Sequence, residues 1–290
     1  MDKRLKLNFC PWPNFGDHVA PYILKKENIP FIFTHHLIHK KITIVGSILR
    51  ISSYPQTKVW GTGLMWESEK LLSNQSEFLA VRGPHTLEQI KKCGADVTNT
   101  VLGDPAILLP RLYKPKSTEK KYKLGIIPHM IDSHVVIYMR ENKDKFKNAI
   151  FIDHNLTSRR VEEFIDKINQ CERVVSTCLH GVIACHAYNI PVRWISEGSK
   201  IIGDGVKFRD HFNSLNLEAE PIPMIKDDNI KFDNTNHMSK LNELSDNLWK
   251  CRPWLQKLDD DYYVDLDDEN WQKECYPDIY TGKIFTDKDV

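Results

Sequence analysis

One strand–helix–strand segment in the second half of the chain constrains its fold more than any other. Arg173–Thr177 is a short β-branched run typical of a buried strand. The tripeptide Leu179–Gly181 leads into a helix-compatible stretch that ends at Asn189, and Val192–Ile195 has the pattern of a second strand. Such a unit predicts a parallel sheet, with His180 at the carboxyl end of a strand and at a helix start. Because ligands bind at this edge and helix N-termini favour anions, we expect a histidine beside a phosphate or carboxylate site.

The same alternation of strands and helices extends along most of the chain. Proline is favoured in the first helical turn and glycine after the last, so Gly83-Pro84 and Gly94 bracket one helix. Apolar residues at helical spacing predict another helix over residues 158–170. The remaining predicted helices are 17–26 and 239–250, and the remaining predicted strands are 5–9, 41–47, 58–63, 78–82, 122–127 and 149–153. This order predicts an α/β fold with parallel sheets and βαβ crossovers.

A linker candidate divides the chain. Residues 110–121 contain two prolines and five basic residues without an apolar period. We therefore expect two Rossmann-like domains with parallel sheets, residues 1–115 and 116–235, with a cleft between them. Residues 236–290 begin with a helix and continue as a tail rich in acids and aromatics. We expect this tail to wrap around the domains as solvated acidic surface.

Composition excludes several classes of protein. The 290 residues carry a net charge of +1, so no global field favours nucleic acid. No run approaches the roughly 18 apolar residues of a membrane helix, and the N-terminus has no apolar signal core, which predicts a cytoplasmic protein. The seven cysteines form no CxxC pair, which predicts free thiols and no zinc site. Cys178, close to His180, is better explained as a packing residue than as a nucleophile.

Small and polar residues gather where predicted strands of the first half end. The segment Asn14–Asp17 permits a tight turn and a helix cap, and a capping role alone would explain it equally well. Gly61-Thr62-Gly63 allows a ligand to approach the backbone, although two glycines are weak evidence. Arg82 ends a strand at a helix start, where its guanidinium could hold an anion at two points or form a surface salt bridge. Gly103–Ala106 is best explained as structural.

The second half adds groups suited to an anion site. His129 follows a strand just as His180 does, and two histidines at equivalent strand ends are expected to share a site. Lys207 and Arg209 follow a glycine-rich turn, residues 203–205. We expect this flexible turn to deliver both cations to the pocket, although a plain surface turn would have the same sequence.

Seven motifs together make the chain resemble the polysaccharide pyruvyl transferases, in particular their exopolysaccharide ketal-pyruvate branch. In order they are Asn14-Phe15-Gly16-Asp17, Gly61-Thr62-Gly63, Val81-Arg82-Gly83-Pro84, Leu102-Gly103-Asp104-Pro105-Ala106, Ile127-Pro128-His129, Leu179-His180-Gly181 and Lys207-Phe208-Arg209-Asp210. The resemblance covers residues 5–215. It implies a fold similar to the two-domain GT-B glycosyltransferases, with residues 1–115 on the acceptor side and residues 116–235 on the donor side. It also implies an enzyme that moves the enolpyruvyl group of phosphoenolpyruvate onto a sugar as a pyruvate ketal, without a metal or other cofactor.

The resemblance also implies roles for individual residues. Arg82 and His180 match family residues associated with donor binding and catalysis. We expect His180 to protonate the donor's methylene carbon, His129 to act as a base or phosphate ligand, and Asp17 to act on the acceptor side. The expected donor contacts are Arg82, Leu179, Gly181, Lys207 and Arg209, and the expected acceptor contacts are Asn14, Gly16, Gly61 and Gly63.

One departure from the family pattern leaves alternatives open. Many members have arginine two positions before the motif histidine, where this chain has Cys178, so Lys207 or Arg209 would have to replace that cation. The rival predictions are a GT-B-type nucleotide-sugar glycosyltransferase that uses the same cleft and a non-catalytic carbohydrate-binding protein. The predicted partners are phosphoenolpyruvate and a saccharide acceptor, with no nucleic acid. A lipid-linked acceptor would bring the protein to the inner face of the cytoplasmic membrane.

Overall fold

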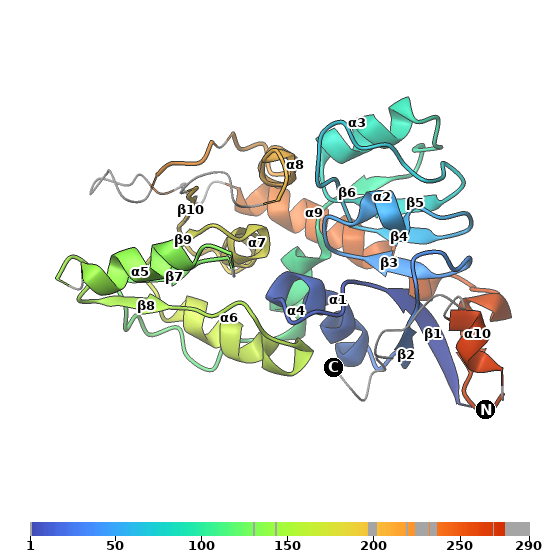
Figure 1. The fold of residues 1–290 in the computed structure, drawn as a ribbon, viewed down its shortest axis with the longest axis horizontal. Coiled ribbons are helices and arrows are strands. Elements are labelled where there is room, and N and C mark those ends of the chain that lie inside the picture. The colour runs from blue at the N-terminus through green and yellow to red at the C-terminus, as the bar shows by residue number, and fades with distance from the viewer. Residues whose placement is uncertain are drawn as a thin grey trace.

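The computed structural model describes residues 2–129, 131–142, 144–196, 202–218, 220–223, 232, 237–268 and 270–275. Strands and helices alternate along these residues and form two lobes, each built on its own sheet (Figure 1). Almost all strand pairs are parallel, which confirms the predicted α/β class and its Rossmann-like layout. The domain boundaries expected at residues 115 and 235 stay predictions.

The larger sheet has the order β11-β1-β3-β4-β5-β6 within the described residues, with β2 also paired to β1. Its strands are β1 (Lys3–Asn8), β2 (Phe31–Phe33), β3 (Ile42–Ile44), β4 (Lys58–Trp60), β5 (Glu77–Val81), β6 (Val101–Leu102) and β11 (Tyr263–Asp265). Both β2 and β3 pair with Leu7, so they lie on opposite sides of β1. The chain therefore changes direction across the sheet at β1, and such switch points are where open α/β sheets bind ligands.

The smaller sheet has the order β10-β9-β7-β8, with all pairs parallel. Its strands are β7 (Leu124–Ile127), β8 (Ala149–Phe151), β9 (Val174–Ser176) and β10 (Val192–Trp194). The chain passes from β7 to β8 on one side and then returns to β9 on the other. This sheet thus has its own switch point between the ends of β7 and β9, which precede His129 and His180.

Helices cover the sheets and join the lobes. The predicted helices form as α1 (Phe15–Lys26), α3 (Pro84–Lys92), η2 with α6 (Ser158–Arg160 and Val161–Asn169), α7 (Leu179–Ala187) and α9 (Met238–Lys250). The sequence analysis did not predict α2 (Leu49–Ser52), η1 with α4 (Pro105–Leu108 and Leu109–Leu112), α5 (Ser133–Glu141), α8 (Val206–Ser214), η3 (Pro253–Leu255), η4 (Asp260–Tyr262) or α10 (Trp271–Cys275). The most consequential of these is α8, because it carries Lys207 and Arg209, which were expected to follow a flexible turn at residues 203–205.

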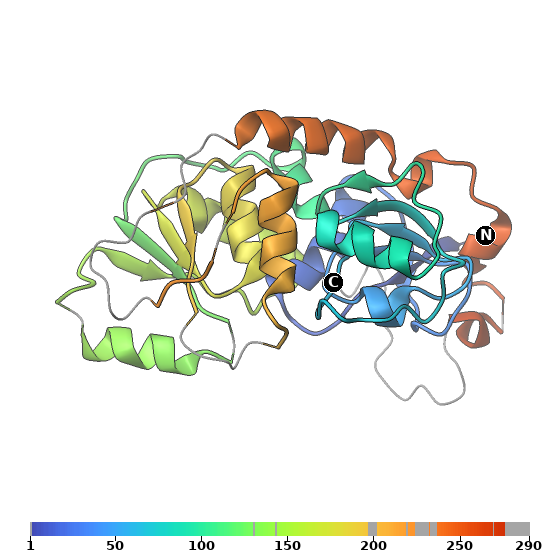
Figure 2. The ribbon, with the colours of Figure 1, turned by 90° about the horizontal axis from the view of Figure 1, so that it is seen from above.

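The two lobes share one hydrophobic core. Helix α1 follows the first strand, yet it packs on α6 and α7 of the other lobe, and the rings of Phe15 and Phe164 stack with centroids 3.9 Å apart. In the opposite direction, α8 packs on α3 of the first lobe. Helix α9 lies across the junction and contacts β6 and η1 (Figure 2). Because α1 packs on the second lobe and α8 packs on the first, the carboxyl ends of β1, β7 and β9 are held in fixed positions relative to one another.

The acidic segment near the C-terminus lies on the surface of the first lobe, and the side chains of Asp259, Asp260 and Asp261 are exposed there. Strand β11 pairs antiparallel with β1 and extends the larger sheet. Asp260 lies 3.0 Å from the Lys3 ammonium, and Asp259 and Asp261 both pair with Lys40. This part of the tail is therefore held on the first lobe by strand pairing and charge, whereas residues 276–290 lie outside the described residues. None of the described helices combines the length and apolar character needed to cross a membrane.

Candidate active site

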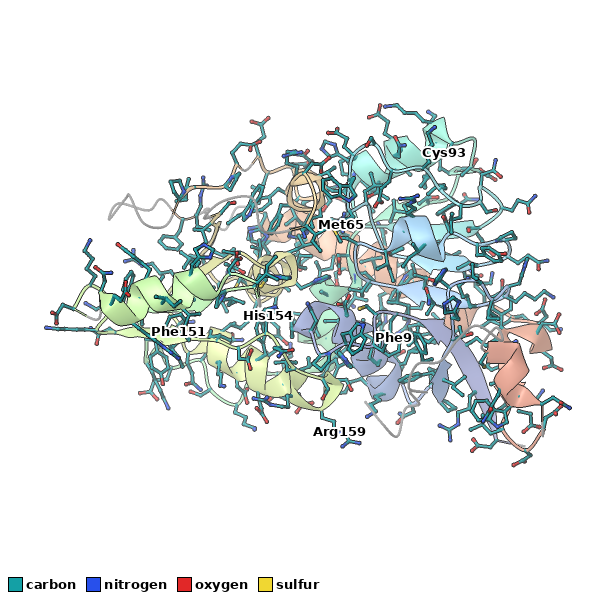
Figure 3. All side chains as sticks on the ribbon, viewed as in Figure 1. Phe9, Met65, Cys93, Phe151, His154 and Arg159 are labelled. Atoms are coloured by element: carbon teal, nitrogen blue, oxygen red, sulfur yellow. The ribbon has the colours of Figure 1, made fainter. Side chains whose placement is uncertain are left out.

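A cavity of about 160 Å³ lies between the lobes, where the chain leaves β1, β7 and β9. Met65 and His154 line it from the first and second lobes, and Figure 3 labels both at the junction. Eight of the twelve predicted site residues line this cavity: Asn14, Gly16, Asp17, His129, Leu179, His180, Gly181 and Lys207. They meet because the switch points of the two sheets face each other, so the carboxyl ends of strands from both lobes contribute to one site.

Two helix N-termini reach the cavity. At the start of α1 the Asn14 side chain accepts a hydrogen bond of 2.9 Å from the Gly16 amide, which is ordinary capping. Helix α7 has Cys178 at its N-cap, and this side chain makes no capping hydrogen bond. The first-turn residues Leu179, His180 and Gly181 line the cavity, so the positive end of the α7 dipole is available to an anion.

His180 is held between the two lobes. A Cβ placed on Gly16 would lie 1.9 Å from its Nδ1, so glycine is required where α1 passes the imidazole. On its other side, Nε2 lies 3.4 Å from Oδ2 of Asp104, which is fully buried. The second oxygen of Asp104 caps η1 by accepting a 2.9 Å bond from the Ala106 amide. Asp104, which the sequence analysis assigned to structure, is therefore also the charge partner of His180.

Lys207 supplies a cation at the cavity wall. The residue is 8% exposed, and its ammonium donates a 2.9 Å hydrogen bond to the Ile202 carbonyl. Burial, with a smaller effect of Arg82, lowers its pKa to about 8, while Asp17 and other groups oppose the shift. No carboxylate lies within ion-pair distance of this ammonium in the described part of the chain. A charged ligand would therefore meet a cation that no ion pair has neutralised.

Three more titratable side chains line the cavity. Burial raises the pKa of Asp17 to about 6, although His180 and Lys207 favour its charged form. Burial and the nearby Lys207 lower the pKa of His129, and burial with His129 lowers the pKa of His154 to about 4. The two imidazoles lie 5.2 Å apart between ring centroids and are neutral at pH 7. His154 was not among the predicted site residues, although this histidine follows β8 much as His129 follows β7.

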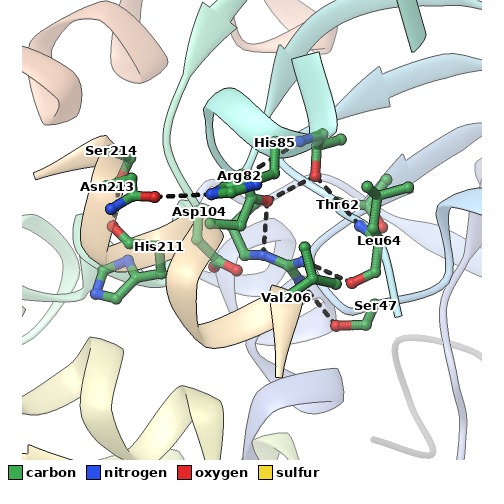
Figure 4. A network of polar contacts seen from close by, with 12 residues as sticks. Ser47, Thr62, Leu64, Arg82, His85, Asp104, Val206, His211, Asn213 and Ser214 are labelled. Carbon is green, nitrogen blue, oxygen red and sulfur yellow. Dashed lines mark hydrogen bonds and ion pairs between the residues drawn. The ribbon is translucent and has the colours of Figure 1, made fainter. Parts of the chain in front are cut away.

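Arg82 does not reach the cavity, which corrects its predicted role as a donor clamp. It is fully buried, and its Nε donates to Asp210 at 3.2 Å in an ion pair between the lobes. Its other nitrogens donate to the Ser47 hydroxyl at 2.7 Å and to the Leu64 carbonyl at 2.6 Å (Figure 4). Asp210 also accepts bonds from the amide and hydroxyl of Thr86. Arg82 thus fixes α8, which carries Lys207, against the first lobe.

The other three predicted contacts also lie outside the cavity. Arg209 is two residues beyond Lys207 on α8, and side chains at this spacing face different directions. Its guanidinium donates to the Asp204 carbonyl at 3.1 Å and borders a neighbouring pocket beside Trp194, which shares Ile202 and Lys207 with the cavity. A Cβ on Gly61 would lie 2.0 Å from Pro105, and one on Gly63 would lie 2.5 Å from Arg82. Both glycines therefore make room for neighbouring protein atoms, and neither lines the cavity.

The burial of Cys178 argues against a nucleophilic role for its thiol. Cys178 is 5% exposed, and burial raises the pKa of its thiol well above the ordinary range, so the nucleophilic thiolate is disfavoured. Across the residues that the structure describes, no group of three or more His, Cys, Asp or Glu side chains has the geometry to hold a metal ion.

Comparison with known proteins places the chain in a family. An uncharacterized protein of Acanthamoeba polyphaga mimivirus is 34% identical over 180 residues, which cover 61% of this chain and 60% of that protein. A crystal structure of a functionally uncharacterized protein from Klebsiella pneumoniae subsp. pneumoniae NTUH-K2044 aligns with 72% of this chain and 87% of its own, with 12% identity and a TM-score of 0.45. The family model described as polysaccharide pyruvyl transferase matches residues 7–199, more than half of the chain and all the strand ends that form the cavity. The chain therefore belongs to the polysaccharide pyruvyl transferase family.

Proposed function

We propose that this protein transfers pyruvate from phosphoenolpyruvate to a saccharide, forming a pyruvate ketal and releasing phosphate. The family itself suggests pyruvyl transfer to polysaccharide. The observation that carries the finer proposal is the arrangement of His180 between Asp104 and the first turn of α1, in a cavity that also contains the Lys207 ammonium. A proton donor and an anion site are the two groups that this reaction needs from the protein.

The size and charge of the cavity support a small anionic donor. Phosphoenolpyruvate carries a carboxylate and a phosphate, which match the Lys207 cation and the N-terminus of α7. The volume of about 160 Å³ is well below the roughly 300–1,000 Å³ of pockets that enclose larger ligands. The small cavity therefore matches phosphoenolpyruvate, whereas a nucleotide sugar, the donor of the rival glycosyltransferase prediction, would have to extend beyond it.

The reaction needs one proton to enter the donor and two to leave the acceptor. Protonation of the methylene carbon forms a C–H bond and leaves an oxocarbenium-like centre at the adjacent carbon. One sugar hydroxyl attacks that centre and loses its proton, the C–O bond to phosphate breaks, and a second hydroxyl then closes the ketal and loses its proton. One of the two released protons replaces the proton used at the methylene carbon, and the other leaves with the phosphate.

His180 is the best-placed acid for the first step. A histidine side chain can donate a proton near neutral pH, and the buried Asp104 carboxylate lies 3.4 Å from Nε2 on the far side of the ring. Its ring is 13% exposed, so it is open to the cavity while its position is fixed by both lobes. We assign Asp17 and His129 to the same cavity as acceptors of hydroxyl protons or as ligands of the leaving phosphate.

Release of phosphate from phosphoenolpyruvate tests the proposal directly. The wild-type protein should release inorganic phosphate when galactose, glucose, mannose or N-acetylhexosamine acceptors are supplied as a panel, and isotope from labelled phosphoenolpyruvate should appear in the sugar. His180→Ala should lower turnover by at least about 100-fold, the lower range for general acid catalysis, without unfolding the protein. The exposed residue His39 lies outside the cavity, so His39→Ala is the matched control. Wild-type turnover in His180→Ala, or transfer from a nucleotide sugar alone, would contradict the proposal.

A further inference from the structure

A second cavity adjoins the first through a shared wall. It has a volume of about 580 Å³ and lies between helix α5 and the end of β8. His129 and His154 line both cavities, so a molecule in the larger one lies next to a molecule in the smaller one. The larger cavity opens at the carboxyl end of β8, the edge of the sheet at which β7 and β9 also end.

The lining of the second cavity combines an apolar platform with a polar rim. Phe151 is 37% exposed and Ile137 is 53% exposed, so both present apolar surface to a ligand. Arg140, Asp153 and Asn155 are exposed at the same cavity. A pyranose ring has the matching chemistry, since its C–H face packs on an aromatic ring and its hydroxyls bond charged and amide side chains.

His154 gives the shared wall an unsatisfied polar atom. The residue is 4% exposed, and its Nε2 is buried with no hydrogen-bond partner among the described residues. Buried polar atoms in native proteins usually have a partner, so a hydroxyl that reached this nitrogen would satisfy it. A hydroxyl group both donates and accepts, so it can satisfy a neutral imidazole nitrogen in either tautomer.

We propose that the second cavity is the acceptor groove, in which a saccharide packs on Phe151 and presents a hydroxyl to His154 at the boundary with the donor cavity. This inference rests on the proposed pyruvyl transfer, because the saccharide is an acceptor only if that reaction occurs. Binding of the saccharide can nevertheless be tested by itself. It moves the main acceptor surface to the second lobe, whereas the sequence placed it on the first. Because His129 and His154 line both cavities, an acceptor hydroxyl at this shared wall would lie beside the donor.

The exposed platform residue provides the cleanest variant. Phe151→Ala removes the ring without opening the core, and it should weaken saccharide binding roughly tenfold while phosphoenolpyruvate binding changes less than twofold. The matched control is Leu72→Ala, which removes an exposed apolar side chain that is 50% accessible and lies outside this cavity. Saccharide binding is measured by saturation-transfer NMR on the same sugar panel, and donor binding by calorimetry on the full chain.

The buried histidine provides a second, independent variant. His154→Gln keeps a polar group at the wall and should raise the acceptor KM less than His154→Ala does, with the melting temperature reporting whether each variant is folded. The acceptor groove is refuted if Phe151→Ala binds every saccharide of the panel as tightly as the wild type does. Absence of phosphate release by the wild type would instead overturn the proposed function. In that case, loss of saccharide binding in Phe151→Ala would still support a sugar site in this groove.

Discussion

At the scale of single residues, we expect Lys207 to control the affinity for the proposed donor. Because burial lowers its pKa to about 8, the ammonium is charged below that pH and loses its charge as the pH rises through it. Donor binding should therefore be strongest below pH 8 and weaken above it. Lys207→Met should raise the donor KM about 10- to 100-fold at pH 7, the effect of losing one charged hydrogen bond.

Lys207→Arg separates charge from other causes of this pH dependence. A guanidinium stays protonated throughout the accessible range, so this variant should keep its donor affinity between pH 8 and pH 9.5, where the wild type loses affinity. Calorimetric titration of phosphoenolpyruvate at several pH values measures both variants. An identical decline in the arginine variant and the wild type would assign the pH dependence to another group.

Asp104 is expected to be a positioning residue for His180. Asp104→Asn keeps the shape of the side chain and the cap on η1 but removes the charge 3.4 Å from the imidazole. Turnover at pH 7 should fall while the melting temperature stays close to that of the wild type, because the variant loses only the charge that faces the imidazole. Asp96→Asn, on an exposed turn, is the control. Unchanged turnover would contradict the positioning role, and a fall in turnover matched by a lower melting temperature would indicate a purely structural role.

At the scale of elements, the Arg82–Asp210 pair holds α8 against the first lobe. Both side chains are fully buried, so Arg82→Ala would leave a carboxylate without its partner and should cost about 3–5 kcal/mol of unfolding free energy. The double variant Arg82→Met with Asp210→Leu leaves no unpaired charge and should be closer to the wild type. Urea unfolding measures both. An unchanged unfolding free energy in Arg82→Ala, with a raised donor KM, would restore the donor-clamp prediction.

The sequence predicted most elements because their signals are local. Proline and glycine bracket α3, and apolar spacing marks α6, so both helices form where periodicity places them. By contrast, α8 follows Gly203 and Gly205 and has few helix signals of its own. It forms because Val206 and Phe208 are buried and Asp210 pairs with the distant Arg82. Contacts across 128 positions leave no local pattern.

The same reasoning separates the site residues that could be predicted from those that could not. His129 and His180 lie at strand ends, and a strand end is a property of the local sequence. Whether Arg82 faces a ligand or Asp210 depends on how the lobes pack, and that packing is a property of the whole fold. Gly61 and Gly63 show the same limit, since the atoms that need the space belong to Pro105 and Arg82.

At the scale of the whole molecule, buried histidines should make the fold sensitive to acid. Burial and neighbouring charges lower the pKa of His211 to about 3 and of His186 well below its ordinary value, and burial lowers the pKa of His18 to about 4. The unfolded chain therefore binds more protons than the folded chain below pH 6.5. Stability should be complete above pH 6.5 and decline as the pH falls toward these values, with Asp17 opposing the trend.

Thermal unfolding between pH 7.5 and pH 4.5 measures this effect. The melting temperature should fall steadily below pH 6.5. His211→Gln should flatten the decline, because it removes one member of the buried contact in which His186 Nδ1 and His211 Nε2 lie 2.9 Å apart. A melting temperature that stays level down to pH 4.5 would show that these rings are already protonated, or solvated, in the native state.

Helix α1 follows the first strand but packs on the opposite lobe, and this has a consequence for the engineering of chimaeras and for recombination between homologous genes. Neither lobe is a transplantable module. A chimaera that replaced the first lobe with that of a distant homologue would also replace Asn14, Gly16 and Asp17, and it would take away the ring that stacks on Phe164. Functional chimaeras should therefore take α1, α6 and α7 from the same parent. Where the two lobes come from different parents, the residues of α1 should match those of α6 and α7 that they contact.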